Sequence, residues 1–108
     1  MKLSDLSAIS PIDGRYSKLV TELQEIFSEY GLIRYRIFIE IEWFIHLSNQ
    51  SNIKELPKLT KATTNSLRVL YKKFNLSAAK KVKNIEQKTN HDVKAIEYYL
   101  KNKFSESE

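Results

Sequence analysis

The quartet "TNHD", which ends at Asp92, stands directly before the apolar run "VKAIEYYL" and is typical of a helix start. Thr89 and Asp92 are three residues apart, which is the spacing of a capping pair. Such a pair stabilises a helix by about 1 kcal/mol and needs no other function. It explains the outer positions of the quartet but not the two inner ones.

Asn90 and His91 occupy those inner positions, in the first turn of the expected helix. Side chains there project from the open end of the helix, where the positive end of the dipole disfavours an imidazolium. We therefore expect a neutral His91 that donates or accepts a hydrogen bond near neutral pH. Such a group suits a site for a polar, anionic ligand.

The stretch "SPIDGRY" is the second candidate site. Pro11 presets φ for a turn, and Asp13 with Gly14 favours the closure of that turn. One interpretation leaves Arg15 and Tyr16 solvated after an ordinary turn. The other aims both side chains at one point, where a planar guanidinium and a phenol would hold a phosphate.

Other catalytic patterns are missing from the sequence. It has no glycine-rich phosphate loop, and Glu40 and Glu42 would point in different directions from a helix, so they predict no acid–base pair. The two histidines lack the spacing of a zinc helix and cysteine is absent, so the sequence predicts no zinc site of either kind. His46 lies in an apolar stretch and is interpreted as a partly buried structural residue.

Composition predicts a single all-α domain over residues 1–108. Apolar residues make up 42% of the chain and charged residues 29%, while two glycines and two prolines are too few for the turns of a β-sandwich. The 32–47 run alternates like a strand, but its length without a breaker favours a central helix. We expect about five helices: one from Ser17 to a cap at Gly31, the 32–47 helix, one starting at Pro57, one capped by Ser77 and one capped by Thr89, with 103–108 a frayed tail.

The charge balance leaves two classes of partner open. Eighteen Lys+Arg against thirteen Asp+Glu give a net charge of +5, which suits a nucleic-acid surface or an anionic small molecule. The excess is concentrated in the lysine-rich 71–84 segment, which is also typical of a solvated helix face. No targeting peptide, membrane-spanning run or cysteine is present, so a cytoplasmic protein is expected.

Four stretches together are similar to one family. In chain order they are "LSAISPIDGRYSKLV", "IFSEYGLIRYRIFIEIEW", "NIKELP" and "IEQKTNHDVKAIEYYLK". They resemble the N-terminal region of the bacterial adenylosuccinate lyase family, which has the all-α fumarase/aspartase-like fold. The resemblance covers nearly the whole chain, is most specific at "SPIDGRY" and "TNHDVKAIEY", and is loosest at 71–84 and "SNQSN".

The resemblance implies a β-elimination. Members of the family release fumarate from adenylosuccinate, leaving AMP, and from the succinylated aminoimidazole carboxamide ribotide of purine biosynthesis. A base removes a proton beside a succinyl carboxylate and an acid protonates the departing nitrogen, without a metal or organic cofactor. The resemblance also implies a homotetramer built around a helical bundle, in which each active site gathers residues from three subunits.

The same resemblance assigns roles to the two motifs. Arg15 and Tyr16 would hold the nucleotide at its phosphate, while Asn90, His91 and Asp92 would line the substrate pocket. His91 would be the active-site histidine of this domain, which positions the substrate and assists proton transfer.

The resemblance also implies that this chain is an incomplete enzyme. The family's acid, a histidine, and its base, a serine on a mobile glycine-rich loop, lie downstream of the matched region. The 108-residue chain is therefore expected to be an N-terminal domain that is inactive alone. The alternative is a free-standing basic helical module for nucleic-acid binding or protein interaction, whereas the resemblance implies a nucleotide substrate and neither a nucleic-acid nor a membrane partner.

Overall fold

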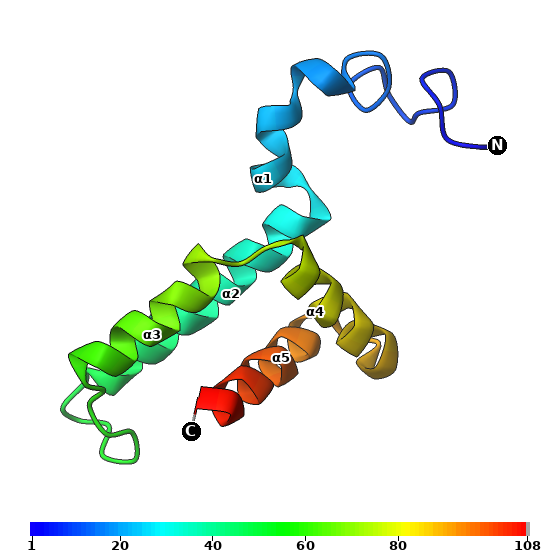
Figure 1. Cartoon of the computed structure of the whole chain (residues 1–108). Coiled ribbons are helices and arrows are strands. Elements are labelled where there is room, and N and C mark those ends of the chain that lie inside the picture. The colour runs from blue at the N-terminus through cyan, green and yellow to red at the C-terminus, as the bar shows by residue number, and fades with distance from the viewer. Residues whose placement is uncertain (108) are drawn as a thin grey trace. The chain divides into compact units, whose positions relative to one another are not determined.

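The computed structural model describes residues 1–107, and every regular element in that part of the chain is a helix (Figure 1). That part contains five α-helices, two short 3-10 helices and no strand, which confirms the all-α prediction. None of its helices is both long and apolar enough to cross a membrane. The chain divides into two compact units, Met1–Leu32 and Ile33–Glu108. They are named here the N-terminal and C-terminal units.

The predicted helix from Ser17 to Tyr30 is wrong, because this part of the N-terminal unit is broken. It holds two 3-10 helices, η1 (Ser17–Leu19) and η2 (Thr21–Leu23), and one turn of α-helix, α1 (Gln24–Phe27). Ser28 ends α1 with extended backbone angles of φ −76° and ψ 168°. None of the three elements has a buried residue, and short helices without tertiary packing are marginal.

Gly31 does not cap the preceding helix as predicted, but lies in the first turn of the next one. Its N–H donates to Ser28 Oγ at 3.0 Å, so Ser28 caps the new helix. A Cβ at Gly31 would stand 2.7 Å from the backbone oxygens of both Glu25 and Ile26. Glycine is therefore needed here for the close approach of α1, not for a left-handed cap.

The predicted 32–47 helix is confirmed, as part of α2 (Glu29–Ser48). The boundary between the two units, after Leu32, falls within this helix. One face is buried in the C-terminal unit and carries a residue at every third or fourth position, each at most 4% exposed: Ile33, Ile37, Ile41, Ile45 and Ser48. Another face is also apolar but 41–60% exposed: Leu32, Tyr35, Ile39 and Trp43. His46 is exposed rather than partly buried, and it stacks on Trp43 with ring centroids 5.6 Å apart.

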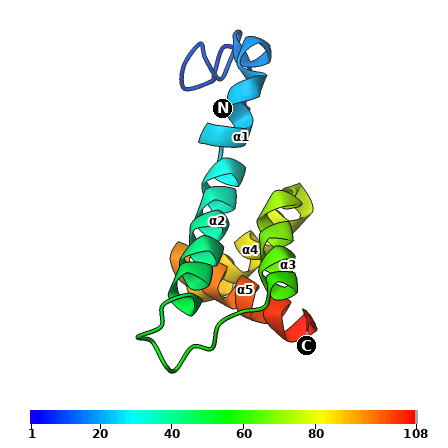
Figure 2. The ribbon, with the colours of Figure 1, turned by 90° about the vertical axis from the view of Figure 1, so that its left-hand side faces the viewer.

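The helix α3 (Lys61–Lys72) packs beside α2 in the C-terminal unit (Figure 2). It begins after Thr60, whose hydroxyl accepts the Thr63 N–H at 3.1 Å, so the prediction that Pro57 opens this helix is wrong. Glu42 of α2 joins the two helices by accepting from Arg68 Nε at 2.9 Å and from the Tyr71 hydroxyl at 2.7 Å.

The helices α4 (Leu76–Thr89) and α5 (Asp92–Ser107) are joined by two residues and pack against each other. Its buried residues are Ala79, Val82, Ala95, Ile96, Tyr99 and Leu100. Asn75 caps α4 by accepting the Ala78 N–H at 2.9 Å, in place of the predicted Ser77 cap. The expected frayed tail does not begin at 103, because α5 continues through Ser107; the last residue of that prediction, Glu108, lies outside the described residues.

Candidate functional site

The connection between α4 and α5 is built by Asn90, which ends α4 in the left-handed conformation with φ 54° and ψ 29°. Its N–H donates to Glu86 O at 2.7 Å, closing the last turn of α4. Asn90 is the one non-glycine residue with positive φ in the described part of the chain. Asparagine tolerates this conformation better than most residues, which gives Asn90 a structural reason to stand in the quartet.

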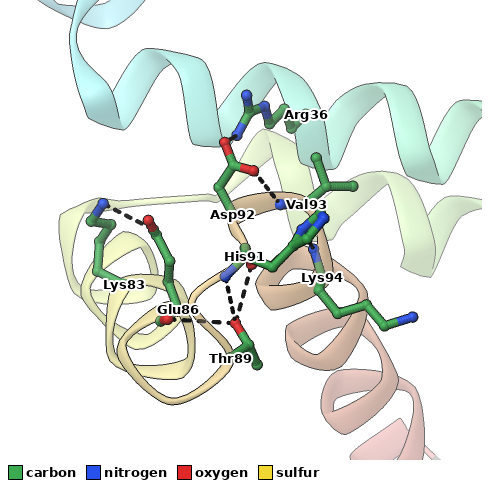
Figure 3. Close-up of polar contacts among 8 residues, drawn as sticks. All are labelled: Arg36, Lys83, Glu86, Thr89, His91, Asp92, Val93 and Lys94. Carbon is green, nitrogen blue, oxygen red and sulfur yellow. Dashed lines mark hydrogen bonds and ion pairs between the residues drawn. The ribbon is translucent and has the colours of Figure 1, made fainter.

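His91, and not Thr89, caps α5, so the predicted Thr89–Asp92 capping pair is wrong (Figure 3). The His91 carbonyl accepts the first helical bond from the Ala95 N–H at 3.0 Å, and His91 Nδ1 accepts the Lys94 N–H at 3.2 Å. The capping geometry is the expected one, but it starts two residues later because Thr89 still belongs to α4.

Thr89 instead fastens the backbone of His91. Its Oγ1 lies 3.1 Å from His91 O, to which it donates, and accepts the His91 N–H at 3.3 Å (Figure 3). These contacts hold the short connection in one conformation from the α4 side. The result is a rigid corner with the imidazole at its tip.

The capping bond determines what His91 can offer to a ligand. An imidazole nitrogen that accepts an N–H must carry a lone pair, so the ring proton is placed on Nε2. No residue of the described range bonds to Nε2, and His91 is exposed. His91 therefore presents one N–H donor to solvent at the N-terminus of α5, where an anion is also favoured by the helix dipole.

Asp92 forms an ion pair with Arg36, a residue that no sequence motif indicates. Its Oδ2 lies 2.7 Å from Arg36 Nη1 of α2, and its Oδ1 accepts the Val93 N–H at 2.8 Å (Figure 3). The Arg36 guanidinium, followed by the Val93 amide, lowers the pKa of Asp92 below its ordinary value of 3.8. The partners are 56 residues apart in the chain, so no local pattern could have revealed the pair.

In the N-terminal unit, the "SPIDGRY" turn is closed by Asp13. Its Oδ1 accepts the Ser10 N–H at 2.8 Å and lies 3.2 Å from the Ser10 hydroxyl. The Ser10 amide is the main reason that the pKa of Asp13 lies below its ordinary value of 3.8. The Tyr16 N–H closes the turn further by donating to Pro11 O at 2.9 Å.

This turn presents Arg15 and Tyr16 together. The Arg15 guanidinium lies over the Tyr16 ring, 4.6 Å from its centroid, and both side chains are exposed. Arg15 also lines a hollow of about 240 Å³ together with Ser10 and Pro11. A guanidinium held on an aromatic face beside a hollow keeps its N–H donors available to an anion.

The five predicted site residues therefore fall into two local groups. Arg15 and Tyr16 form one group in the N-terminal unit, and the other, formed by Asn90, His91 and Asp92, lies in the C-terminal unit. Among the side chains that the structure describes, those of residues 1–105, no three histidines, aspartates or glutamates gather in a way that could hold a metal ion.

Comparison with known proteins gives a consistent result along the whole chain. The chain is 51% identical to an adenylosuccinate lyase of Dictyostelium discoideum over 104 residues, which are 95% of this chain and 22% of that protein. It is 49% identical to that of Buchnera aphidicola from Schizaphis graminum over 107 residues (99% and 24%). The enzyme of Escherichia coli K12 is 44% identical over 106 residues (98% and 23%). No protein-family model matches the chain.

The chain spans about a quarter of the length of the curated relatives that it matches, and the matched part is their N-terminal region. The matched region includes both "SPIDGRY" and "TNHD", since each match covers at least 95% of the chain. By sequence, the chain corresponds to the N-terminal region of adenylosuccinate lyases.

Proposed function

We propose that this chain forms the N-terminal part of an adenylosuccinate lyase, which eliminates fumarate from adenylosuccinate to give AMP and acts likewise on the succinylated aminoimidazole carboxamide ribotide. The observation that carries the proposal is the 44–51% identity to lyases across nearly the whole chain. The exposed Nε2–H of His91 at a helix N-terminus supports it, because the substrate is an anion with several oxygen acceptors.

Each group of side chains receives a role in this proposal. Arg15 and Tyr16 bind the phosphate of the nucleotide, for which the guanidinium supplies a planar fork of donors. His91 donates from Nε2 to a substrate oxygen and assists proton transfer, while Asn90 and Asp92 shape the pocket wall around it.

The elimination itself needs groups that this chain does not supply. A base takes the proton from the succinyl carbon, the carbon–nitrogen bond breaks, and an acid protonates the departing nitrogen. In the proposal, the downstream histidine and serine of the longer enzyme act as acid and base, and this chain alone is inactive. No metal or organic cofactor takes part.

A homotetramer is part of the same proposal, as is a cytoplasmic location. In this assembly each active site gathers residues from three subunits. The alternative of a free-standing nucleic-acid-binding module has no support among the relatives, which are named as lyases.

A chimeric enzyme tests the proposal. This chain replaces the matched 106 residues of the Escherichia coli lyase, and turnover of adenylosuccinate is followed by ultraviolet absorbance. We expect the chimera to be active and the 108-residue chain alone to show no turnover. A chimera that assembles like the parent enzyme and yet releases no fumarate would contradict the proposed function.

A further inference from the structure

Arg36 connects the core of the C-terminal unit to the tip that carries His91. It projects from α2 toward the first residue of α5, where its Nη1 lies 2.7 Å from Asp92 Oδ2 (Figure 3). The arginine stands between Ile33 and Ile37, which are 4% and 0% exposed, and its own side chain is only 31% exposed. It is therefore attached to one of the most firmly packed stretches of the molecule.

The contact with Arg36 holds the Asp92 carboxylate in place. The carboxylate then accepts the Val93 N–H only, and the Lys94 N–H remains for His91. Asp92 Oδ1 accepts the Val93 N–H, and His91 Nδ1 accepts the Lys94 N–H. The two neighbouring side chains thus each accept one amide of the first turn of α5. A carboxylate without its arginine could rotate and compete for the same donors, since aspartate is itself a strong capping residue.

We propose that Arg36 is a positioning residue for His91: by holding Asp92 it keeps the imidazole on the Lys94 amide, with the Nε2–H directed outward to a phosphate or carboxylate oxygen. This inference rests on the proposed function for the identity of the ligand. The positioning of His91 by Arg36 is inferred from the ion pair with Asp92 and needs no ligand. Arg36 does not touch the ligand in this proposal. It acts through Asp92 and the start of α5.

The tautomer of His91 is the first measurement, made on the 108-residue chain itself. ¹⁵N chemical shifts distinguish a protonated Nε2 from a protonated Nδ1, and amide hydrogen exchange reports the bond from Lys94. The variants are Arg36→Gln, which removes the charge, and Arg36→Lys, which keeps it. The matched control is Arg68→Gln. Arg68 of α3 also forms an ion pair with a carboxylate, that of Glu42 on α2, but this pair does not involve the start of α5.

In the wild-type chain we expect the Nε2–H tautomer and a protected Lys94 amide. Arg36→Gln should mix the tautomers and speed exchange at Lys94 by about tenfold, with partial recovery in Arg36→Lys. Arg68→Gln should change neither. Wild-type spectra in Arg36→Gln, or equal changes in both glutamine variants, would overturn the proposal, since the second result means a general loss of stability.

Turnover in the chimera is the second measurement. Arg36→Gln should lower kcat by roughly 10- to 100-fold, as expected for a misplaced catalytic group, with a smaller change in KM. An unchanged kcat would overturn the positioning role even if the tautomer shifts. An inactive wild-type chimera would count against the proposed function instead, and the spectroscopic result on the chain would still decide the role of Arg36.

Discussion

At the scale of single residues, His91 has two separable tasks: it caps α5 through Nδ1 and presents a donor through Nε2. Its residue type and place in "TNHD" predicted a neutral side chain at a helix start, but the cap was assigned to Thr89. The capping pattern alone could not distinguish these registers, because both residues precede the same apolar run and both can accept an amide.

The two tasks of His91 can be tested apart in the isolated chain. Asparagine is a good cap but lacks the outward ring N–H, so His91→Asn should leave the free energy of unfolding within about 0.5 kcal/mol of wild type, whereas His91→Ala should lower it by about 1 kcal/mol. Urea denaturation followed by circular dichroism gives both values. Equal stability of the two variants would remove the capping role.

Asn90 provides a second prediction at this scale, because its φ of 54° is costly for a branched side chain. Asn90→Val should lower the free energy of unfolding by roughly 1–2 kcal/mol by straining the α4–α5 connection, while Asn90→Gly should be nearly neutral. The same denaturation experiment compares the two. A tolerated valine would mean that the corner does not depend on the left-handed residue.

At the scale of elements, α2 was predicted and the broken segment before it was not. Sixteen residues of helical apolar spacing in 32–47 made a helix the better choice. Leu19, Leu23 and Ile26 have the same spacing, but nothing in the described structure buries them. Periodicity indicates which residues can share a face, and it cannot show whether that face finds a partner.

Gly31 tests the junction of α1 and α2. An alanine Cβ would approach two backbone oxygens to 2.7 Å, which is closer than atoms can pack without backbone movement. We expect Gly31→Ala to open the Ser28 cap and to increase amide hydrogen exchange at Gly31 and Leu32. Unchanged protection of both amides would show that the close approach of α1 is not maintained in solution.

The contact of Glu42 with α3 should make the C-terminal unit sensitive to acid. The hydrogen bonds from Arg68 and then Tyr71 lower the pKa of Glu42 below its ordinary value of 4.5. A carboxylate of this kind stabilises the fold above its unfolded pKa, and that stabilisation disappears as the pH falls through the lower, folded pKa.

Glu42→Gln should therefore destabilise the chain by roughly 1 kcal/mol at about pH 7, and by less at about pH 2.5. Urea titrations of both proteins at the two pH values measure the difference. A loss that is the same at both values would show that the charge of Glu42 does not contribute.

At the scale of the whole molecule, the described chain leaves much apolar surface uncovered. Leu3, Leu6, Ile9, Leu19 and Phe27 are each at least 78% exposed, and Trp43 is 56% exposed. Such surface is unusual for an isolated protein and is expected where further protein packs. Sequence alone predicted the fold class and the family, but it could not show the division into two units, which depends on contacts between distant residues.

Trp43 tests whether this surface belongs to the proposed assembly. Because Trp43 is largely exposed, Trp43→Glu should change the stability of the isolated chain by no more than about 0.5 kcal/mol. In the chimera it should weaken the tetramer, as measured by sedimentation velocity. A variant chimera that assembles as well as the parent would place Trp43 outside the subunit and domain contacts.

In the proposed function, His91 of this chain serves the elimination of fumarate. The kcat of the chimera with His91→Asn measures this role directly. Because asparagine keeps the cap and removes the ring donor, we predict unchanged helix content and assembly with kcat lower by roughly 100- to 10,000-fold. A His91→Asn chimera that turns over adenylosuccinate at nearly the parent rate would contradict this role.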